Sequence, residues 1–147
     1  MAESFAMKKS LLLVLIALML SSCGGPEEGS LEKTLAEAKA GNVDAMLNLG
    51  FMYDNGKGVI QDFKEAVKWY RKAVELGHAE AMDSLGGMYA NRRHVRQQDA
   101  VEAYAWFNVA AEKGLKKAAD KRDWIKKIMT PEQIAEGQKR SREIAEK

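Results

Sequence analysis

The stretch AMLNLGFMYDNGKGVIQDFKEAVKWYRKAVELG, residues 45–77, contains two amphipathic halves joined by a glycine-containing connection. In the first half, Ala45 and Leu49 are spaced at i and i+4, which places both on one face of a helix. The second half has a similar apolar stripe and opens on Asp62, a residue type that caps helices. Between the halves, residues 55–59 (NGKGV) supply two glycines for a turn. The stretch therefore predicts a helix–loop–helix unit.

The unit recurs once more along the chain, at a distance of 36 to 37 residues. The matched pairs are Ala45/Ala81, Leu49/Leu85, Gly50/Gly86, Tyr53/Tyr89, Val59/Val95, Asp62/Asp99, Ala66/Ala103, Trp69/Trp106, Tyr70/Phe107, Ala73/Ala110 and Gly77/Gly114. Because the step changes between Val59 and Asp62, the extra residue of the second copy falls in a loop. Stacking such units buries the apolar side that a single helix pair leaves exposed.

These residues resemble the Sel-1-like repeat, a relative of the tetratricopeptide repeat. The family pattern A-x-x-x-L-G-x-x-Y-x-x-G-x-G-V-x-x-D-x-x-x-A-x-x-W-Y-x-x-A-x-x-x-G is met almost throughout from Ala45 to Gly77. A plain tetratricopeptide unit lacks the G-x-G-V loop. In the second copy, Arg92 and His94 replace the two loop glycines and Phe107 replaces the tyrosine. The resemblance implies an all-α fold, a short right-handed α-solenoid of antiparallel helix pairs.

The helix boundaries of the two copies are predicted from their capping residues. Asp62 with Glu65, and Asp99 with Glu102, have the three-residue spacing of a capping box, with an acid as the first member. Each pair predicts that a helix begins directly after the first acid.

The predicted repeat domain covers residues 31–147. Core repeats are expected at 45–80 and 81–117, and degenerate flanking helices at 31–44 and 118–147. The sequence TPEQ, residues 130–133, predicts a capped start for a last helix that is polar on most sides. Such a polar helix is expected to end the stack.

The first residues of the chain predict export. A short positive start (7–10) precedes an unbroken apolar run (11–20, LLLVLIALML) and two small residues before Cys23. A run of ten residues fits the apolar part of a secretory signal, about 7–15 residues long. It is too short for the roughly 20 residues of a membrane-spanning helix.

The segment Leu20-Ser21-Ser22-Cys23 resembles the bacterial lipobox. The resemblance implies a lipoprotein signal peptide at 1–22, lipid on the Cys23 sulfur and a flexible tether at 23–30. Several acyl chains would anchor the protein stably in a membrane. Gly24, rather than an aspartate, after the lipid cysteine favours the outer membrane facing the periplasm. The other interpretation is an ordinary signal peptide with an incidental cysteine.

The net charge excludes few classes of function, but charge is unevenly distributed between the two parts of the chain. A net charge of +2 does not imply a nucleic-acid partner, and none is expected. Residues 113–147 carry 11 basic and 6 acidic side chains, whereas residues 23–112 carry 10 and 14. The basic end is either a solvated helix face or a site for an acidic partner or an anionic membrane.

Motifs for catalysis or cofactor binding are absent from the sequence. It contains no phosphate-binding glycine loop, no dinucleotide fingerprint and no zinc-protease motif. His78 and His94 occupy different repeat positions, so they are not expected to converge on a metal ion. We therefore expect no enzymatic activity, no catalytic residue, no cofactor and no metal site.

One repeat position predicts a binding surface. Phe51, Gly87 and Trp124 share this position on the first helices of successive units. In helical solenoids the first helices line the concave face, and two aromatic residues flanking a glycine would form an apolar groove. The other interpretation places Trp124 beneath the last helix. The remaining residues of the predicted partner-binding face are Asp44, Leu47, Asn48, Glu80, Asp83 and Ser84.

These observations predict a membrane-anchored adaptor or scaffold of the bacterial cell envelope that binds a protein or peptide. Some Sel-1-like lipoproteins are immunity proteins, so a secreted antibacterial toxin such as a phospholipase is an alternative partner. Cysteine-rich relatives have been proposed to hydrolyse cell-wall compounds or β-lactams. A cell-envelope hydrolase is disfavoured here because their paired cysteines are missing.

Overall fold

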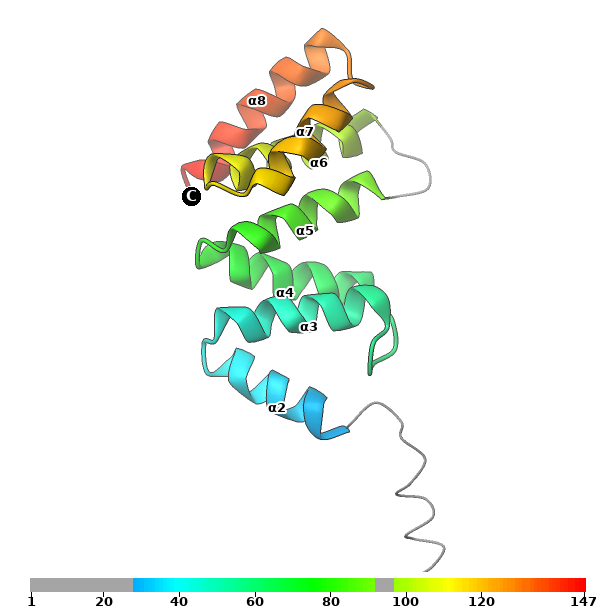
Figure 1. Cartoon of the computed structure of the whole chain (residues 1–147), viewed down its shortest axis with the longest axis vertical. Coiled ribbons are helices and arrows are strands. Elements are labelled where there is room, and N and C mark those ends of the chain that lie inside the picture. The colour runs from blue at the N-terminus through cyan, green and yellow to red at the C-terminus, as the bar shows by residue number, and fades with distance from the viewer. Residues whose placement is uncertain (1–27, 92–96) are drawn as a thin grey trace, which may run out of the picture.

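The chain forms an elongated stack of helices in a computed structural model that describes residues 28–91 and 97–147 (Figure 1). The helices are α2 (Glu28–Lys39), α3 (Val43–Asn55), α4 (Phe63–Glu75), α5 (Ala79–Ala90), α6 (Gln97–Glu112), α7 (Lys116–Lys126) and α8 (Pro131–Ala145). No strand occurs among these residues, so the predicted all-α solenoid is confirmed. Outside the described residues lie the predicted signal peptide 1–22, Cys23, Arg92 and His94.

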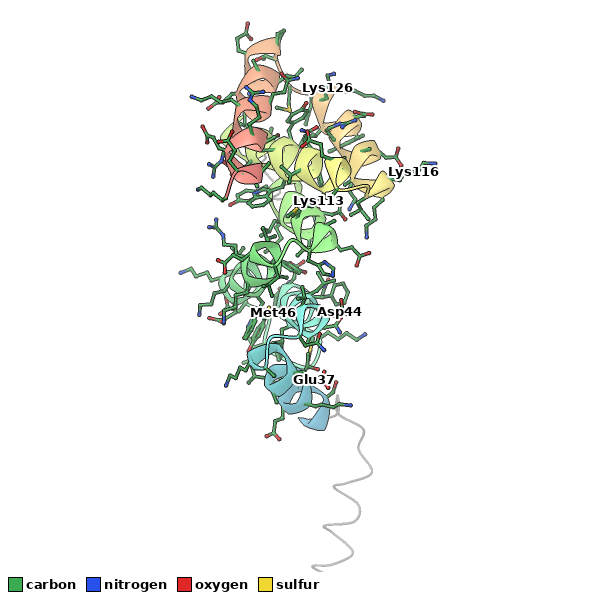
Figure 2. All side chains as sticks on the ribbon, turned by 90° about the vertical axis from the view of Figure 1, so that its left-hand side faces the viewer. Glu37, Asp44, Met46, Lys113, Lys116 and Lys126 are labelled. Carbon is green, nitrogen blue, oxygen red and sulfur yellow. The ribbon has the colours of Figure 1, made fainter. Side chains whose placement is uncertain are left out.

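Successive helices from α2 to α7 pack as neighbours along the stack, including the two helices of each repeat unit, α3 with α4 and α5 with α6, while α8 packs against α6. The first helices, α3, α5 and α7, form one layer (Figure 1). In the side view, Asp44 of α3 and Lys116 of α7 lie on the same side of the molecule (Figure 2). This layer contains every residue of the predicted partner-binding face.

The helix starts agree with the sequence in part. Helix α2 begins at Glu28, three residues before the predicted start at Leu31, so the end of the predicted tether is helical. At the other end of the domain, the TPEQ prediction is confirmed. The Thr130 hydroxyl accepts a hydrogen bond from the Gln133 N–H (3.3 Å), and Gln133 Oε1 accepts one from the Thr130 N–H (2.8 Å).

The two acidic capping boxes were predicted wrongly in different ways. Asp62 does cap α4, because its carboxylate accepts hydrogen bonds from the N–H groups of Lys64 (2.9 Å) and Glu65 (3.2 Å). Glu65 pairs with Lys68 instead of folding back, which keeps two negative charges apart. Asp99 lies within the first turn of α6, because this helix begins at Gln97, two residues before Asp99.

Glycine–ring contacts hold the helices of this stack close together. Gly86 on α5 lies against the ring of Phe107 on α6, and a Cβ atom there would lie 2.7 Å from that ring. Gly50 receives the Tyr70 ring in the same way in the first copy, and Gly137 receives Tyr104. The Leu-Gly pair of each repeat therefore joins a buried leucine to a close helix contact.

Most of the apolar residues that recur in the two copies are buried. Trp69 and Trp106, at equivalent positions of the two copies, are both in the core. The loop glycines Gly56 and Gly58 have φ angles of +67° and +76°, as the turn prediction required. Within the described residues, no helix is both long and apolar enough to cross a bilayer.

Candidate functional site

A groove of about 1110 Å³ opens on the layer of first helices. Five of the predicted partner-binding residues line it: Phe51, Asp83, Ser84, Gly87 and Trp124. Helix α5 lies between α3 and α7 along the stack, so it forms the middle of the groove (Figure 1). Helices α4 and α6 contribute side chains from behind, including Phe63, Lys64, Val67, Tyr70 and Phe107.

Two exposed aromatic rings lie on opposite sides of this groove. Phe51 of α3 is 52% exposed and Trp124 of α7 is 57% exposed. Trp124 is therefore a groove residue and is not buried beneath α8. Between them, a Cβ atom built on Gly87 would meet no atom within 4 Å. The groove thus has open space in the middle, large enough for an apolar side chain from another molecule.

Four of the predicted residues do not line the groove. Asp44 and Glu80 lie in the first turns of α3 and α5, seven residues before Phe51 and Gly87, about 10 Å away along each helix. Leu47 is partly buried between the repeats and packs against the hydrophobic core. The fourth residue, Asn48, is exposed outside the groove.

The two first-turn acids contact the next repeat instead. The Asp44 carboxylate lies 3.3 Å from Nε2 of His78, at the start of α5. Glu80 Oε1 lies 3.5 Å from Nζ of Lys117, near the start of α7. These contacts connect the first helices along one edge of the layer.

An ion pair inside the groove was missed by the sequence prediction. Asp83 is only 4% exposed, and Nζ of Lys121 donates to both of its carboxylate oxygens, at 2.9 and 2.8 Å. The pair joins α5 to α7. The repeat spacing could have indicated Lys121, because Asn48, Ser84 and Lys121 share one repeat position at steps of 36 and 37 residues. Only Asn48 and Ser84 belong to the predicted partner-binding face.

Two groups that line the groove, Asp54 and Tyr70, have raised pKa values. Asp54 is half-buried, and partial burial raises the pKa of its carboxyl group. Among the described residues, its carboxylate has no hydrogen-bond or ion-pair partner. Burial, with a smaller contribution from the nearby Asp54 charge, raises the pKa of Tyr70 to about 12.

The chemistry available in the groove favours binding. No histidine of the described residues lines it, and these residues contain no group of three or more His, Cys, Asp or Glu side chains placed to hold a metal ion. What it offers is apolar contact at three exposed aromatic side chains (Phe51, Phe63 and Trp124), hydrogen bonding at Ser84, and the charges of Asp54, Lys64 and Lys121.

A comparison with known families decides the class of protein. The Sel1 repeat model matches residues 43–78 and 79–115. This chain is a Sel1-repeat protein. Each matched unit contains one helix pair, α3 with α4 and then α5 with α6. Sel1-repeat proteins are protein-interaction modules.

Solved Sel1-repeat structures have the same architecture. The crystal structure of c5321, a protective antigen of uropathogenic Escherichia coli strains with an SLR fold, aligns with a TM-score of 0.75 and 31% identity, over 88% of this chain and 28% of that chain. A Sel1 repeat protein from Oxalobacter formigenes aligns with a TM-score of 0.52 and 36% identity, over 60% and 66% of the two chains.

Curated Sel1-repeat relatives are much longer than this chain, which spans between 10% and 14% of their length. Protein DSF2 of Saccharomyces cerevisiae is 32% identical over 84 residues (56% of this chain, 11% of DSF2). The ERAD-associated E3 ubiquitin-protein ligase component HRD3A of Arabidopsis thaliana is 34% identical over 67 residues (45% and 10%). The secretory immunoglobulin A-binding protein EsiB of E. coli O6:H1 is 37% identical over 69 residues (46% and 14%).

Proposed function

We propose that this Sel1-repeat protein is an adaptor of the bacterial cell envelope that binds a segment of another protein in the groove between α3 and α7. The observation that carries the proposal is the groove itself, with Phe51 and Trp124 exposed on either side of the open space at Gly87. Relatives named for binding or for assembly, EsiB and HRD3A, support the same class of function.

The energetics of the two rings support binding at this place. Large aromatic side chains dominate the affinity of protein interfaces when a partner covers them, and truncating such a residue commonly costs 2 kcal/mol or more, roughly thirtyfold in affinity. Both residues lie on helices, so their backbone is already ordered before a partner binds, and only the side-chain rotamers lose freedom.

The proposal is tested by capture of envelope proteins on the purified protein, followed by mass spectrometry. The Phe51→Ala/Trp124→Ala double variant is expected to lose the captured partner. Ile60 and Leu76 are 91% and 56% exposed and lie outside the groove, so Ile60→Ala/Leu76→Ala serves as the matched control and should retain it. Equal capture by both double variants would remove the groove from the proposal.

We further propose that lipid on Cys23 anchors the protein in the outer membrane, facing the periplasm. The support is the sequence alone, namely the apolar run at 11–20 and the lipobox-like Leu20-Ser21-Ser22-Cys23. Labelling cells with an alkyne-bearing fatty acid should tag the wild-type protein and leave Cys23→Ser untagged. An untagged wild-type protein would refute the anchor, while the groove proposal would be unaffected.

A secreted antibacterial toxin is the second candidate partner, and the basic character of α7 favours an acidic one. Helix α7 carries five basic and two acidic side chains. If the protein neutralises such a toxin, deleting its gene should make cells sensitive to siblings that deliver the toxin, and expression of the protein should restore survival. Unchanged survival of the deletion strain would exclude this function.

A further inference from the structure

The three first helices that form the groove differ in charge. Helices α3 and α5 each carry two acidic and no basic side chains, whereas α7 carries five basic and two acidic ones. The three helices follow one another along the stack in the order α3, α5, α7 (Figure 1). Of the charged residues that line the groove, Asp54 comes from α3 and Lys121 from α7, while Lys64 comes from α4 and Asp83 is paired with Lys121.

The half-buried carboxylate of Asp54 dominates the α3 side. It lines the groove without a hydrogen-bond or ion-pair partner among the described residues. Lys64 also lines this part of the groove, but it is exposed, so solvent and salt screen its charge more strongly than that of Asp54. A positively charged group placed next to Asp54 would compensate for the partial desolvation of its carboxylate.

Ordered ammonium groups characterise the α7 side. Lys121 is held by the buried carboxylate of Asp83, which accepts two of its hydrogen bonds. An ammonium group has three donors, so Lys121 retains one for a bound partner. Lys117 lies nearby, 3.8 Å from Asp83, and its side chain is half-exposed. The α7 side can therefore donate a hydrogen bond to an acceptor of the partner. A carboxylate is the strongest acceptor available to a protein partner.

The helical construction of the groove makes side chains decisive for recognition. Its lining residues come from helices α3 to α7 and their ends, so their backbone groups are largely used inside the helices. A partner cannot add a strand here, because strand addition needs the free backbone groups of a sheet edge. Selectivity must come from which side chains the partner brings.

On these grounds, and on the basis of the proposed function, we propose the chemistry of the segment that occupies the groove. It presents a large apolar side chain to the space at Gly87, a basic side chain to Asp54 on the α3 side, and an acidic side chain to Lys121 on the α7 side. A segment carrying charges of one sign would meet repulsion on one of the two sides.

The test is a selection of peptides from a random displayed library on the purified, folded protein. Peptides with a central aromatic or large aliphatic residue flanked by one basic and one acidic residue are expected. Gly87→Leu fills the open space from a helical position where a Cβ atom meets nothing, so the variant should fold and bind the selected peptides about tenfold or more weakly.

A charge reversal tests which side of the groove receives the basic side chain of the peptide. Asp54→Lys is expected to change the preference at one end of the peptide from basic to acidic, while the apolar residue is retained. Asp44→Lys makes the same charge change on the same helix but outside the groove, and should leave the preference unchanged. Circular dichroism confirms that each variant is folded.

The outcomes separate this inference from the proposed function. Selected peptides that lack the two opposite charges, or that do not respond to Asp54→Lys, would overturn the inference. A selection that yields no Gly87-dependent peptide would overturn it as well. In both cases the capture experiment with Phe51→Ala/Trp124→Ala still decides whether the groove binds a protein.

Discussion

Gly86 and Gly87 are adjacent in α5 but have opposite surroundings. Gly86 is buried against the Phe107 ring, whereas Gly87 opens into the groove. Both lie in a helix, where glycine is less favourable than alanine by about 1 kcal/mol. The same substitution at the two positions therefore separates backbone propensity from packing.

We expect Gly86→Ala to lower the free energy of unfolding by about 1–3 kcal/mol, because the new methyl group must displace the buried Phe107 ring. Gly87→Ala should raise it by about 0.5–1 kcal/mol, since the methyl group meets nothing. Urea unfolding followed by circular dichroism measures both. Changes of the same sign would mean that Phe107 does not lie against Gly86 as described.

Burial of Tyr70 predicts sensitivity to alkali. Its pKa is raised to about 12 from the ordinary 10.0, so the unfolded chain releases this proton at a lower pH than the folded chain does. The free energy of unfolding should therefore fall as the pH rises from 10 towards 12. Tyr70→Phe preserves the ring next to Gly50 and should lose this part of the pH dependence. Unfolding both proteins across this range tests it, and identical pH dependence would contradict the burial of the hydroxyl.

Helices α5 and α7 are joined by the buried carboxylate of Asp83 and the ammonium group of Lys121. Lys121→Met would remove both hydrogen bonds that this carboxylate accepts from Lys121 and leave Lys117, 3.8 Å away, as its remaining ion-pair partner, so we expect the free energy of unfolding to fall by about 1–3 kcal/mol. Lys116→Met, on the same helix but exposed and without an ion pair to any other residue that the structure describes, should change it by about 0.5 kcal/mol or less. Chemical unfolding of the two variants makes the comparison, and equal losses would argue against a structural ion pair.

The last helix covers the apolar side of α6 and so completes the stack. Gly137 of α8 lies against the Tyr104 ring, and Arg140 Nε donates to Glu102 Oε1 at 2.7 Å. A repeat array needs such a terminal unit, because an uncovered helix pair exposes its apolar side to water.

We expect removal of residues 130–147 to lower the melting temperature and to cause self-association, because Tyr104 and its apolar neighbours become exposed. Removing only residues 146–147, which follow α8 and are exposed, should have little effect. Thermal unfolding and size-exclusion chromatography measure both changes. A monomeric truncated protein with unchanged melting behaviour would show that α8 is not required to close the stack.

The local features of this protein could be predicted because each depends on a few consecutive residues. Helix periodicity, the glycines of the NGKGV turn and the Thr130–Gln133 box all act within about one helical turn. The acidic caps were the exception. Asp62 and Asp99 occupy equivalent repeat positions, but α6 begins at Gln97, before Asp99, whereas α4 begins directly after Asp62, which caps it.

The repeat spacing of 36 to 37 residues was enough to predict the class of fold and to place Phe51, Gly87 and Trp124 at one repeat position on successive first helices. It could not establish how deep each side chain lies, because depth depends on how closely α3, α5 and α7 approach one another. That packing buries the carboxylate of Asp83 under Lys121 and leaves Asp54 partly desolvated. Burial and charge pairing are properties of residues brought together from different repeats, so they came into existence only when the helices stacked.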